Sequence, residues 1–540
     1  MSSGSSSRRL SVTLLAVSAL VLGGASARAA FADPPGRVAR ISVVDGQVSF
    51  RPADLDDWSE AEINYPLTTG DHVSTGRGAR TELDLGDALV RLGPSTEISI
   101  LTLDDRAIEL RVTGGTMDVR VRDLDAGDVF DVETPNSRMS ARQPGTYRVD
   151  VSGDRSTITI RVGSADVMAA NGAFPLRAQQ SLVLTGLGAP RVQPRAAIGI
   201  DEFETWCLER DRRIDGSSSA RYVPADLIGA SDLDDYGTWT TSVEYGPMWM
   251  PRVGAEWVPY RDGRWMWIDP WGWTWVDDSP WGFAPFHYGR WVSLRSGWGW
   301  VPGRFVARPV YAPALVAFVG DGGWDVSLSL GRGPVCWFPL GPREAFVPSY
   351  RVSANYVHAV NLPHVNVTSA SFANVRYANR DVPGAVTAVS RDTFVRAQHV
   401  GRAAIAVPRE QLRNATVVGH AAPIAQPQPV SRPSVPPAPP QQPSRPAQLT
   451  QPARPVPQPQ PVQPVPSQPE PRPVPPRGRP APAQAPSPPP APSPAPEAPR
   501  ARPKERPQSQ AQDPKQDQKR QPEERPAGRR QAPPDDTHRK

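Results

Sequence analysis

Apolar and polar residues alternate with a period of two early in the chain. Leu83 and Leu85 alternate with polar residues, a Gly86-Asp87 step marks a turn, and Val90 and Leu92 resume the alternation. Side chains on a β-strand point alternately to opposite faces, so this pattern predicts a hairpin with one buried and one solvent-facing side.

A second stretch repeats this pattern around a Ser152-Gly153-Asp154 turn. Its alternating apolar residues are Tyr147, Val149 and Val151 before the turn, and Ile158, Ile160 and Val162 after it. Almost no helical periodicity occurs before Leu184. We therefore predict a mainly β first domain over residues 36–190, with a β-sandwich or jelly-roll-like fold.

Tryptophans dominate the segment between residues 236 and 303, which holds twelve of the sixteen in the chain. The Tyr-Gly-Arg-Trp sequence at residues 288–291 has looser copies at residues 236–239, 245–249 and 260–265. Trp-x-Trp spacing places both rings on one face of a strand. The pattern predicts short β-hairpins stacked side by side, in a second domain over residues 200–415.

Two interpretations of these tryptophans remain open. Each ring buries about 150–250 Å² and can lock small hairpins together, so the rings can simply form the core. Alternatively, some rings form an open face on which the rings of a glycan stack, with polar side chains at the rim. The candidate stacking residues are Trp265, Trp267, Trp271, Trp273, Trp275 and Trp291. The candidate rim residues are Asp269, Asp277, Asp278 and His287.

The first 32 residues have the layout of a secretory signal peptide. Arg8 and Arg9 precede an apolar run over residues 10–22, which is too short to span a membrane. Small-x-small sites at residues 27–29 and 30–32 both fit a cleavage point. A buried first helix is the alternative, and both the Sec and the Tat route stay open. No later stretch predicts a transmembrane helix, so we expect a soluble exported protein, periplasmic or secreted.

Composition changes near residue 420. Residues 421–540 contain 39 of the 66 prolines and carry 18 Lys and Arg residues against 9 Asp and Glu. This composition predicts a disordered, proline-rich tail over residues 420–540. The chain carries +5 and the tail +9, so the part before the tail carries −4. A basic tail suits binding to an anionic surface such as acidic lipid or cell-wall polymer. The alternative is that the tail is a solvated spacer with no specific partner. Export of the protein makes nucleic acid the least favoured partner.

The two cysteines, Cys207 and Cys336, each stand next to a tryptophan. An oxidising compartment permits a disulfide between them, and two unrelated buried thiols are the alternative. Neither cysteine has a CxxC partner or nearby ligand histidines, so the sequence predicts no zinc site and no other metal or cofactor.

No enzyme motif stands out. The chain has no GxSxG elbow, P-loop, dinucleotide glycine motif or HExxH frame. Asp269 and Asp277 form the one carboxylate pair near the tryptophans that would suit a glycosidase. Thr146 could attack the carbonyl of Gly145 in an N-to-O acyl shift, but a turn entering a strand is the simpler interpretation. We therefore predict no catalytic residues.

Several short motifs occur along the first domain: a Leu-x-x-Gly-Asp step at residues 67–71, a Pro-Ser step at residues 94–95, and the Thr134-Pro135 and Gly145-Thr146 steps. With these motifs, residues 36–184 resemble a FecR-type domain. FecR-type sensors span the membrane and relay a signal to a sigma factor. This chain departs from them in having a signal peptide and no predicted transmembrane helix. The resemblance therefore implies an exported β-domain that makes contacts.

The tryptophan-rich part contains the segment WVPYRDGRWMWIDPWGWTWVDDSPWGFAPFHYGRW at residues 257–291. From this segment through residues 337–350 and 382–389 to about residue 412, the chain resembles the DUF6600 family of exported bacterial proteins. Such proteins often carry a FecR-like domain before this core and a proline-rich tail behind it. The family has no established activity, so the resemblance implies an architecture rather than a task.

Together these observations predict a non-enzymatic envelope protein with a binding or scaffold role. In the leading hypothesis, aromatic faces contact peptidoglycan or another glycan, or the domains contact an envelope protein, while the tail reaches an anionic surface. The alternative is a periplasmic sensory or regulatory partner that keeps a FecR-like role. A cell-wall glycosidase is the third hypothesis.

Overall fold

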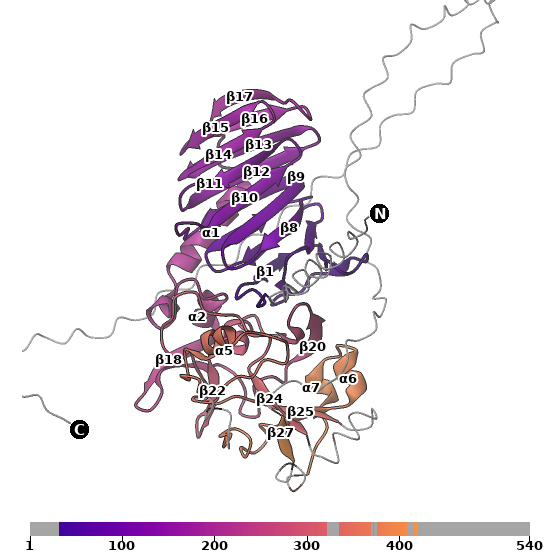
Figure 1. Ribbon diagram of the computed structural model, residues 1–540, viewed down its shortest axis with the longest axis vertical. Helices are drawn as coiled ribbons and strands as arrows, with labels where there is room; N and C mark the ends of the chain where they lie inside the picture. Colours follow the sequence, from indigo (N-terminus) through magenta and orange to yellow (C-terminus); the bar gives the residue numbers. More distant parts are fainter. Residues whose placement is uncertain are drawn as a thin grey trace, which may run out of the picture. The chain divides into compact units, whose positions relative to one another are not determined.

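The computed structural model describes residues 32–320, 334–368, 371, 375–408, 410, 412 and 415–418. Residues 1–31 of the predicted signal peptide and the whole predicted tail lie outside these ranges. Within the described part the chain is mostly β, as the alternating pattern predicts (Figure 1). No helix in that part is long and apolar enough to cross a membrane.

Two sheets form the first part of the fold, which we call the sandwich (residues 39–196). The first sheet contains, in spatial order, β4 (Pro66–Leu67), β1 (Ala39–Asp45), β6 (Arg80–Asp84), β7 (Ala88–Leu92), part of β9 (Ala107–Val121), β12 (Gly145–Ser152), β13 (Arg155–Val162), β16 (Gln180–Thr185) and β17 (Arg191–Ala196). The second contains β3 (Ser59–Glu60), β2 (Val48–Arg51), β5 (His72–Thr75), β8 (Glu97–Leu103), the rest of β9, β10 (Val129–Thr134), β11 (Ser137–Ala141), β14 (Ser164–Ala169) and β15 (Gly172–Arg177).

The long strand β9 belongs to both sheets and changes sheet at Gly114-Gly115. Gly115 has a φ of +91°, and a Cβ built there would stand 2.3 Å from Thr96 Oγ1. Only glycine accepts this conformation and this close approach without strain. The crossover lets one strand close both sheets around a shared apolar core.

Both predicted hairpins form, but the expected solvent-facing side of the first is wrong, because helix α1 (Glu202–Asp215) covers it and every residue of β7 is buried. Leu83 pairs with Val90 across the β6–β7 ladder, and Ser152 pairs with Arg155 at the end of the β12–β13 ladder. The Leu-x-x-Gly-Asp step is a turn closed by Asp71, whose carboxylate accepts hydrogen bonds from the backbone N–H of Thr68 at 2.8 Å and of Ala53 at 2.9 Å. The motif therefore has a structural explanation.

Each sheet ends at one side in a strand that contains a proline. Pro175 lies in β15 and Pro194 lies in β17, and both strands have one unpaired edge among the described strands. Proline lacks a backbone N–H, so it interrupts the row of donors that another strand would need. These edges therefore resist extension of the sheets by a further strand.

The connecting segment (residues 201–236) begins with a helix that the alternating pattern does not reveal. It contains α1 (Glu202–Asp215), the 3₁₀ helices η1 (Ser218–Arg221) and η2 (Ala230–Asp232), and α2 (Leu233–Tyr236). The Asp201 side chain caps α1 by accepting a hydrogen bond from Glu204 N at 2.9 Å. Acidic residues fill the first turn and arginines the last turn, which suits the helix dipole.

Helix α1 packs on the outer face of the first sheet through buried charges. Arg91 on β7 contacts Glu82 at 2.8 Å and Asp211 of α1 at 2.8 Å, and all three side chains are at least four-fifths buried. Arg210 of α1 also pairs with Glu82 at 2.6 Å. Burial raises the pKa of Glu82, but the hydrogen bond from Arg210 and the charge of Arg91 outweigh it and lower the value to about 2.

Short hairpins form the tryptophan-rich segment (residues 237–301), as predicted. A four-stranded sheet has the order β18 (Gly237–Ser242), β19 (Gly246–Pro251), β23 (Gly297–Val301) and β22 (Arg290–Leu294). A separate hairpin contains β20 (Gly263–Ile268) and β21 (Gly272–Asp277). A third sheet has the order β26 (Thr387–Val389), β25 (Val335–Pro339), β24 (Val316–Gly320) and β27 (Thr416–Val418). Short helices accompany them: α3 (Ala284–His287), α5 (Ala354–Asn361), α6 (Arg391–Val395) and α7 (Val400–Ala403).

Three of these hairpins repeat one arrangement of glycine and tryptophan. A glycine stands just before or at the start of one strand, and the tryptophan two residues later pairs directly with a tryptophan of the other strand. The pairs are Trp239 with Trp249, Trp265 with Trp275, and Trp291 with Trp300. Each opposing indole lies against the glycine: a Cβ on Gly237, Gly263 or Gly289 would stand 2.2, 2.7 or 2.3 Å from it. The Gly-x-Trp repeat of the sequence therefore corresponds to the same glycine–tryptophan contact in each of the three hairpins.

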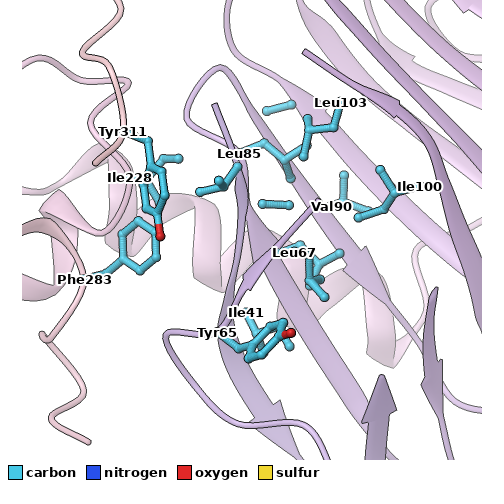
Figure 2. Close-up of a cluster of buried hydrophobic side chains, with 14 of the residues drawn as sticks. Ile41, Tyr65, Leu67, Leu85, Val90, Ile100, Leu103, Ile228, Phe283 and Tyr311 are labelled. Carbon is cyan, nitrogen blue, oxygen red and sulfur yellow. The ribbon is translucent and has the colours of Figure 1, made fainter. Parts of the chain in front are cut away.

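The sandwich and the tryptophan-rich segment are joined through one continuous core. Ile41, Leu67 and Leu85 lie near Ile228, Phe283 and Tyr311 within a single cluster of buried side chains (Figure 2). Beside it, the buried Arg40 of β1 donates hydrogen bonds to Asp232 Oδ2 at 2.6 Å and to Pro280 O at 2.9 Å. The two parts therefore pack as one body.

Candidate functional site

Five of the six candidate stacking residues lie in the core. Trp265, Trp271, Trp273, Trp275 and Trp291 are each at most 5 % exposed. A stacking face needs indole surfaces that are open to solvent, and these surfaces are covered by protein. The expectation of a ladder of open aromatic faces is therefore wrong for these five residues, and the structure favours packing.

Other aromatic rings cover these tryptophans. Trp265 contacts Trp275 with ring centroids 5.6 Å apart, Trp337 at 5.4 Å and Phe394 at 5.3 Å. The pairs with Trp275 and Trp337 are edge to face, and such pairs stabilise a core beyond the area they bury. Trp337 and Phe394 belong to elements far along the chain, so period-two spacing within the segment could not reveal that they cover the tryptophan face of the β20–β21 hairpin.

Trp267 is the one candidate stacking residue that stays half-buried. Its indole N–H donates a hydrogen bond to Asp269 Oδ1 at 3.1 Å, and Asp269 is exposed. Its ring meets Trp273 edge to face, with centroids 5.6 Å apart at 88°. One half-buried indole with one carboxylate is a smaller surface than the predicted ladder.

The predicted rim residues do not form a rim. Asp277 is buried and accepts hydrogen bonds from the Trp275 indole N–H and from Ser279 N, both at 3.0 Å. Burial, against these hydrogen bonds, raises the pKa of Asp277 to about 8. Asp269 and Asp278 are exposed, and Asp278 pairs with His399 at 3.1 Å. Asp277 is therefore closed off from a substrate that would bind at Asp269.

His287 is also buried, contrary to its expected place at a rim. Its Nδ1 lies 2.8 Å from the carbonyl oxygen of Ala312, and burial lowers the pKa of the ring to about 3. Its Nε2 has no hydrogen-bond partner in the described part of the chain. The ring stacks on Tyr311 with centroids 4.7 Å apart, which makes it a neutral member of the core.

The expected disulfide is absent: Cys207 and Cys336 are both free and buried. Cys207 lies in α1, whereas Cys336 lies in β25 within a separate cluster that includes Leu315 and Phe338. Burial raises the pKa of both thiols, to about 12 for Cys336, and nearby Asp118 adds to the effect on Cys207. Neither is therefore a reactive thiolate.

The Gly145-Thr146 step lies at the start of strand β12. Both residues are paired in the sheet, Gly145 with Val121 and Thr146 with Arg120. A Cβ on Gly145 would stand 2.2 Å from Val162 O, so close packing of backbones explains the glycine. The step therefore has a structural explanation, without an acyl shift.

A cleft lies between the sandwich, the connecting segment and the loop around residue 308. It has two parts, of about 250 and 590 Å³, which share Asp87, Asp226 and Arg308 in their walls. Seven aspartates and four arginines line it: Asp84, Asp87, Asp105, Asp123, Asp125, Asp215, Asp226, Arg37, Arg106, Arg122 and Arg308. Clefts between packed parts of a chain are common ligand sites, so this cleft is the candidate functional site.

Most charged groups in the cleft already have partners. Asp87 pairs with Arg37 at 2.5 Å, and Arg308 pairs with Asp125 at 2.8 Å and also with Asp128. Burial raises the pKa of Asp87, against the charge of Arg37. Arg122 donates to the carbonyls of residues 86 and 225 instead of to a carboxylate. The carboxylates of the cleft are therefore not fully neutralised.

Sequence reasoning missed this cleft because its walls come from distant parts of the chain. Asp84 and Asp226 are separated by more than a hundred residues, and Tyr288 was visible in the sequence only as the tyrosine of the tryptophan repeat. No motif or spacing links them. Among the described residues, no group of three or more His, Cys, Asp or Glu side chains could hold a metal ion.

The described part of the chain is a β-rich fold with a charged cleft, and comparison with protein families matches its two parts to two families. The FecR protein family matches residues 71–166, within the sandwich, and the DUF6600 family of unknown function matches residues 230–344. The predicted order of the two families is therefore confirmed. The FecR match indicates, at a coarse level, a regulatory or sensory role.

Two crystal structures of a candidate anti-sigma factor from Parabacteroides distasonis ATCC 8503 are similar to part of the chain. They are 15% and 16% identical, with TM-scores of 0.22 and 0.21, and the match covers 23% of this chain and 59% of each. The chain thus spans about three fifths of their length. TM-scores this low do not establish a shared fold. No curated protein matches the chain.

Proposed function

We propose that this chain is a non-enzymatic protein of the cell envelope with a regulatory or sensory role, acting by contact with a ligand or partner. The FecR match over residues 71–166 carries the proposal. It is supported by the sandwich itself, where the carboxylate of Asp71 holds a turn together through hydrogen bonds to backbone N–H groups. The two matched parts share one hydrophobic core. Binding of a ligand or partner to one part can therefore change the conformation of the other.

The carboxylates near the tryptophans do not favour a glycosidase. A glycosidase needs two carboxyl groups that flank one bond of the substrate. Asp277 is sealed in the core while Asp269 is exposed, so the two do not face a common opening. A glycan scaffold is also less well supported, since five of the six proposed stacking rings are covered.

Deletion of the gene tests the proposed role. A regulatory or sensory protein should change a defined set of transcripts when it is lost, and the full chain should restore them. A chain lacking residues 1–32 should not restore them, because we expect the protein to act outside the cytoplasm. Unchanged transcripts together with a weakened envelope would contradict regulation and support the scaffold role.

A further inference from the structure

One tyrosine in the wall of the cleft holds a hydroxyl that the fold does not use. Tyr288 is 8 % exposed as a residue, and its hydroxyl makes no hydrogen bond with any described residue. A hydroxyl that no protein group occupies can hydrogen-bond to water or to a ligand. Tyr288 lines the smaller part of the cleft, beside Asp87 and Asp226.

The surroundings of this hydroxyl are acidic. The negative charges of Asp84 and Asp226 act on the Tyr288 hydroxyl, and the positive charge of Arg37 opposes them. Burial, and then these two carboxylates, raises the pKa of Tyr288 well above its ordinary value, so the hydroxyl keeps its proton. A neutral hydroxyl and nearby carboxylates form a set of acceptors that suits a group rich in N–H donors.

Asp226 is the carboxylate in this cleft that is available to bind such a group. Asp84 accepts hydrogen bonds from the backbone N–H of Gly86 at 3.0 Å and of Gly229 at 2.9 Å, and Asp87 pairs with Arg37. The Asp226 carboxylate, by contrast, has no hydrogen bond or ion pair with any described residue. It is half-buried and lines both parts of the cleft.

Apolar side chains also contribute to the walls of the cleft. Ile214, Leu227 and Phe305 line the larger part of the cleft, and Phe305 is 68 % exposed, which is unusual for phenylalanine. A ligand with a short alkyl chain could cover these side chains while its charged end reaches Asp226. The volume of about 590 Å³ is in the range of small-molecule sites.

We propose that this cleft binds a ligand through an alkylammonium or alkylguanidinium group, with Asp226 as its ion-pair partner and the Tyr288 hydroxyl as a further acceptor. The proposal deepens the proposed sensory role by naming the class of ligand, and rests on that role for its biological meaning. Free amines and the Lys or Arg side chains of peptides share this chemistry.

Three probes that differ in one group test the proposal: hexylammonium, hexanol and hexanoate, titrated into the full chain and followed by ligand-detected NMR. Hexylammonium should bind at least about tenfold more tightly than hexanol, because a charge-assisted hydrogen bond is stronger than a neutral one. Hexanoate should not bind. Equal binding of hexylammonium and hexanol would overturn the proposal.

Variants connect the binding to the two residues. Asp226→Asn should weaken hexylammonium about tenfold or more, and Tyr288→Phe should weaken it by a smaller factor. Tyr288→Phe should not lower the melting temperature, because the hydroxyl it removes has no partner. Asp57→Asn makes the same charge change at an exposed position outside the cleft and should leave binding intact. Unchanged binding by Asp226→Asn would also overturn the proposal.

A lysine-containing tetrapeptide with blocked ends distinguishes the sources of the cation. Binding of the peptide in competition with hexylammonium would identify a peptide side chain as a fitting ligand, whereas binding of hexylammonium alone would identify a free amine. Failure of both would refute the cation site. The gene-deletion result is independent of these titrations, so failure of the site and failure of the regulatory role can be told apart.

Discussion

Gly263 lies against the indole of Trp275, so closely that a Cβ on the glycine would stand 2.7 Å from Trp275 Cζ2. The same Cβ would stand 2.4 Å from the carbonyl oxygen of Val276. Trp265, two residues after the glycine, pairs directly with Trp275 in the β20–β21 ladder. The glycine therefore makes room for the pair of indoles around which this hairpin packs.

Gly263→Ala should strongly destabilise the protein. The added methyl group meets backbone and a buried ring, neither of which can move freely, so we expect a loss of about 1–3 kcal/mol or more in the free energy of unfolding. Denaturant unfolding measures it. Gly254→Ala is the matched control, since a Cβ there meets no atom within 4 Å. Equal stability of the two variants would contradict the packing role of the glycine.

Asp277 should make stability fall as the pH rises. Its folded-state pKa of about 8 lies above its ordinary value of 3.8, so between these values the folded state binds more protons than the unfolded state. The contribution is fully present below about pH 4 and is lost as the pH rises through about 8. The slope approaches about 1.4 kcal/mol per pH unit.

Asp277→Asn should flatten that slope, which thermal or denaturant unfolding at pH 5, 6, 7 and 8 would reveal. Asp278→Asn makes the same substitution at the exposed neighbour and should leave the slope in place. An unchanged slope in Asp277→Asn would mean that this carboxyl group is not held in its neutral form by burial.

The buried charges under helix α1 should matter far more than those at the surface. Glu82→Gln leaves Arg91 and Arg210 without their shared carboxylate, and breaking a buried pair typically costs about 3–5 kcal/mol. Asp45→Asn breaks the exposed pair with Arg80 and should cost at most about 1 kcal/mol. Chemical denaturation measures the free energy of unfolding of both variants. If both variants lost a similar amount, the buried ion pairs would not be what holds α1 against the sheet.

The two thiols should not react with a thiol reagent in the folded protein and should react after unfolding. Cys207 and Cys336 are buried and free, and burial holds both in the neutral form. Titration with a thiol reagent under non-reducing conditions should therefore detect almost no thiol in the native state and two per chain in denaturant. Detection of none in denaturant would establish that a disulfide forms after all.

The sequence predicted the hairpins well, because period-two alternation and Gly-Asp turns are local signals. It did not predict which tryptophans are covered, since their coverage depends on Trp337 and Phe394, which come from later elements. For the same reason, the sequence could not predict that Asp226 and Tyr288 line the same cleft, or that Cys207 and Cys336 are not bonded to each other. Each of these depends on long-range packing that spacing along the chain does not encode.

Oxidative footprinting of the native full chain, read by mass spectrometry, tests the central claim that the tryptophan-rich segment is a packed core. Trp265, Trp275 and Trp291 should be protected, while the half-buried Trp267 and Trp206 should be modified. Unfolding should abolish the difference. Modification of Trp265, Trp275 and Trp291 in the native protein at the rate of Trp267 would contradict this account and restore an open aromatic face.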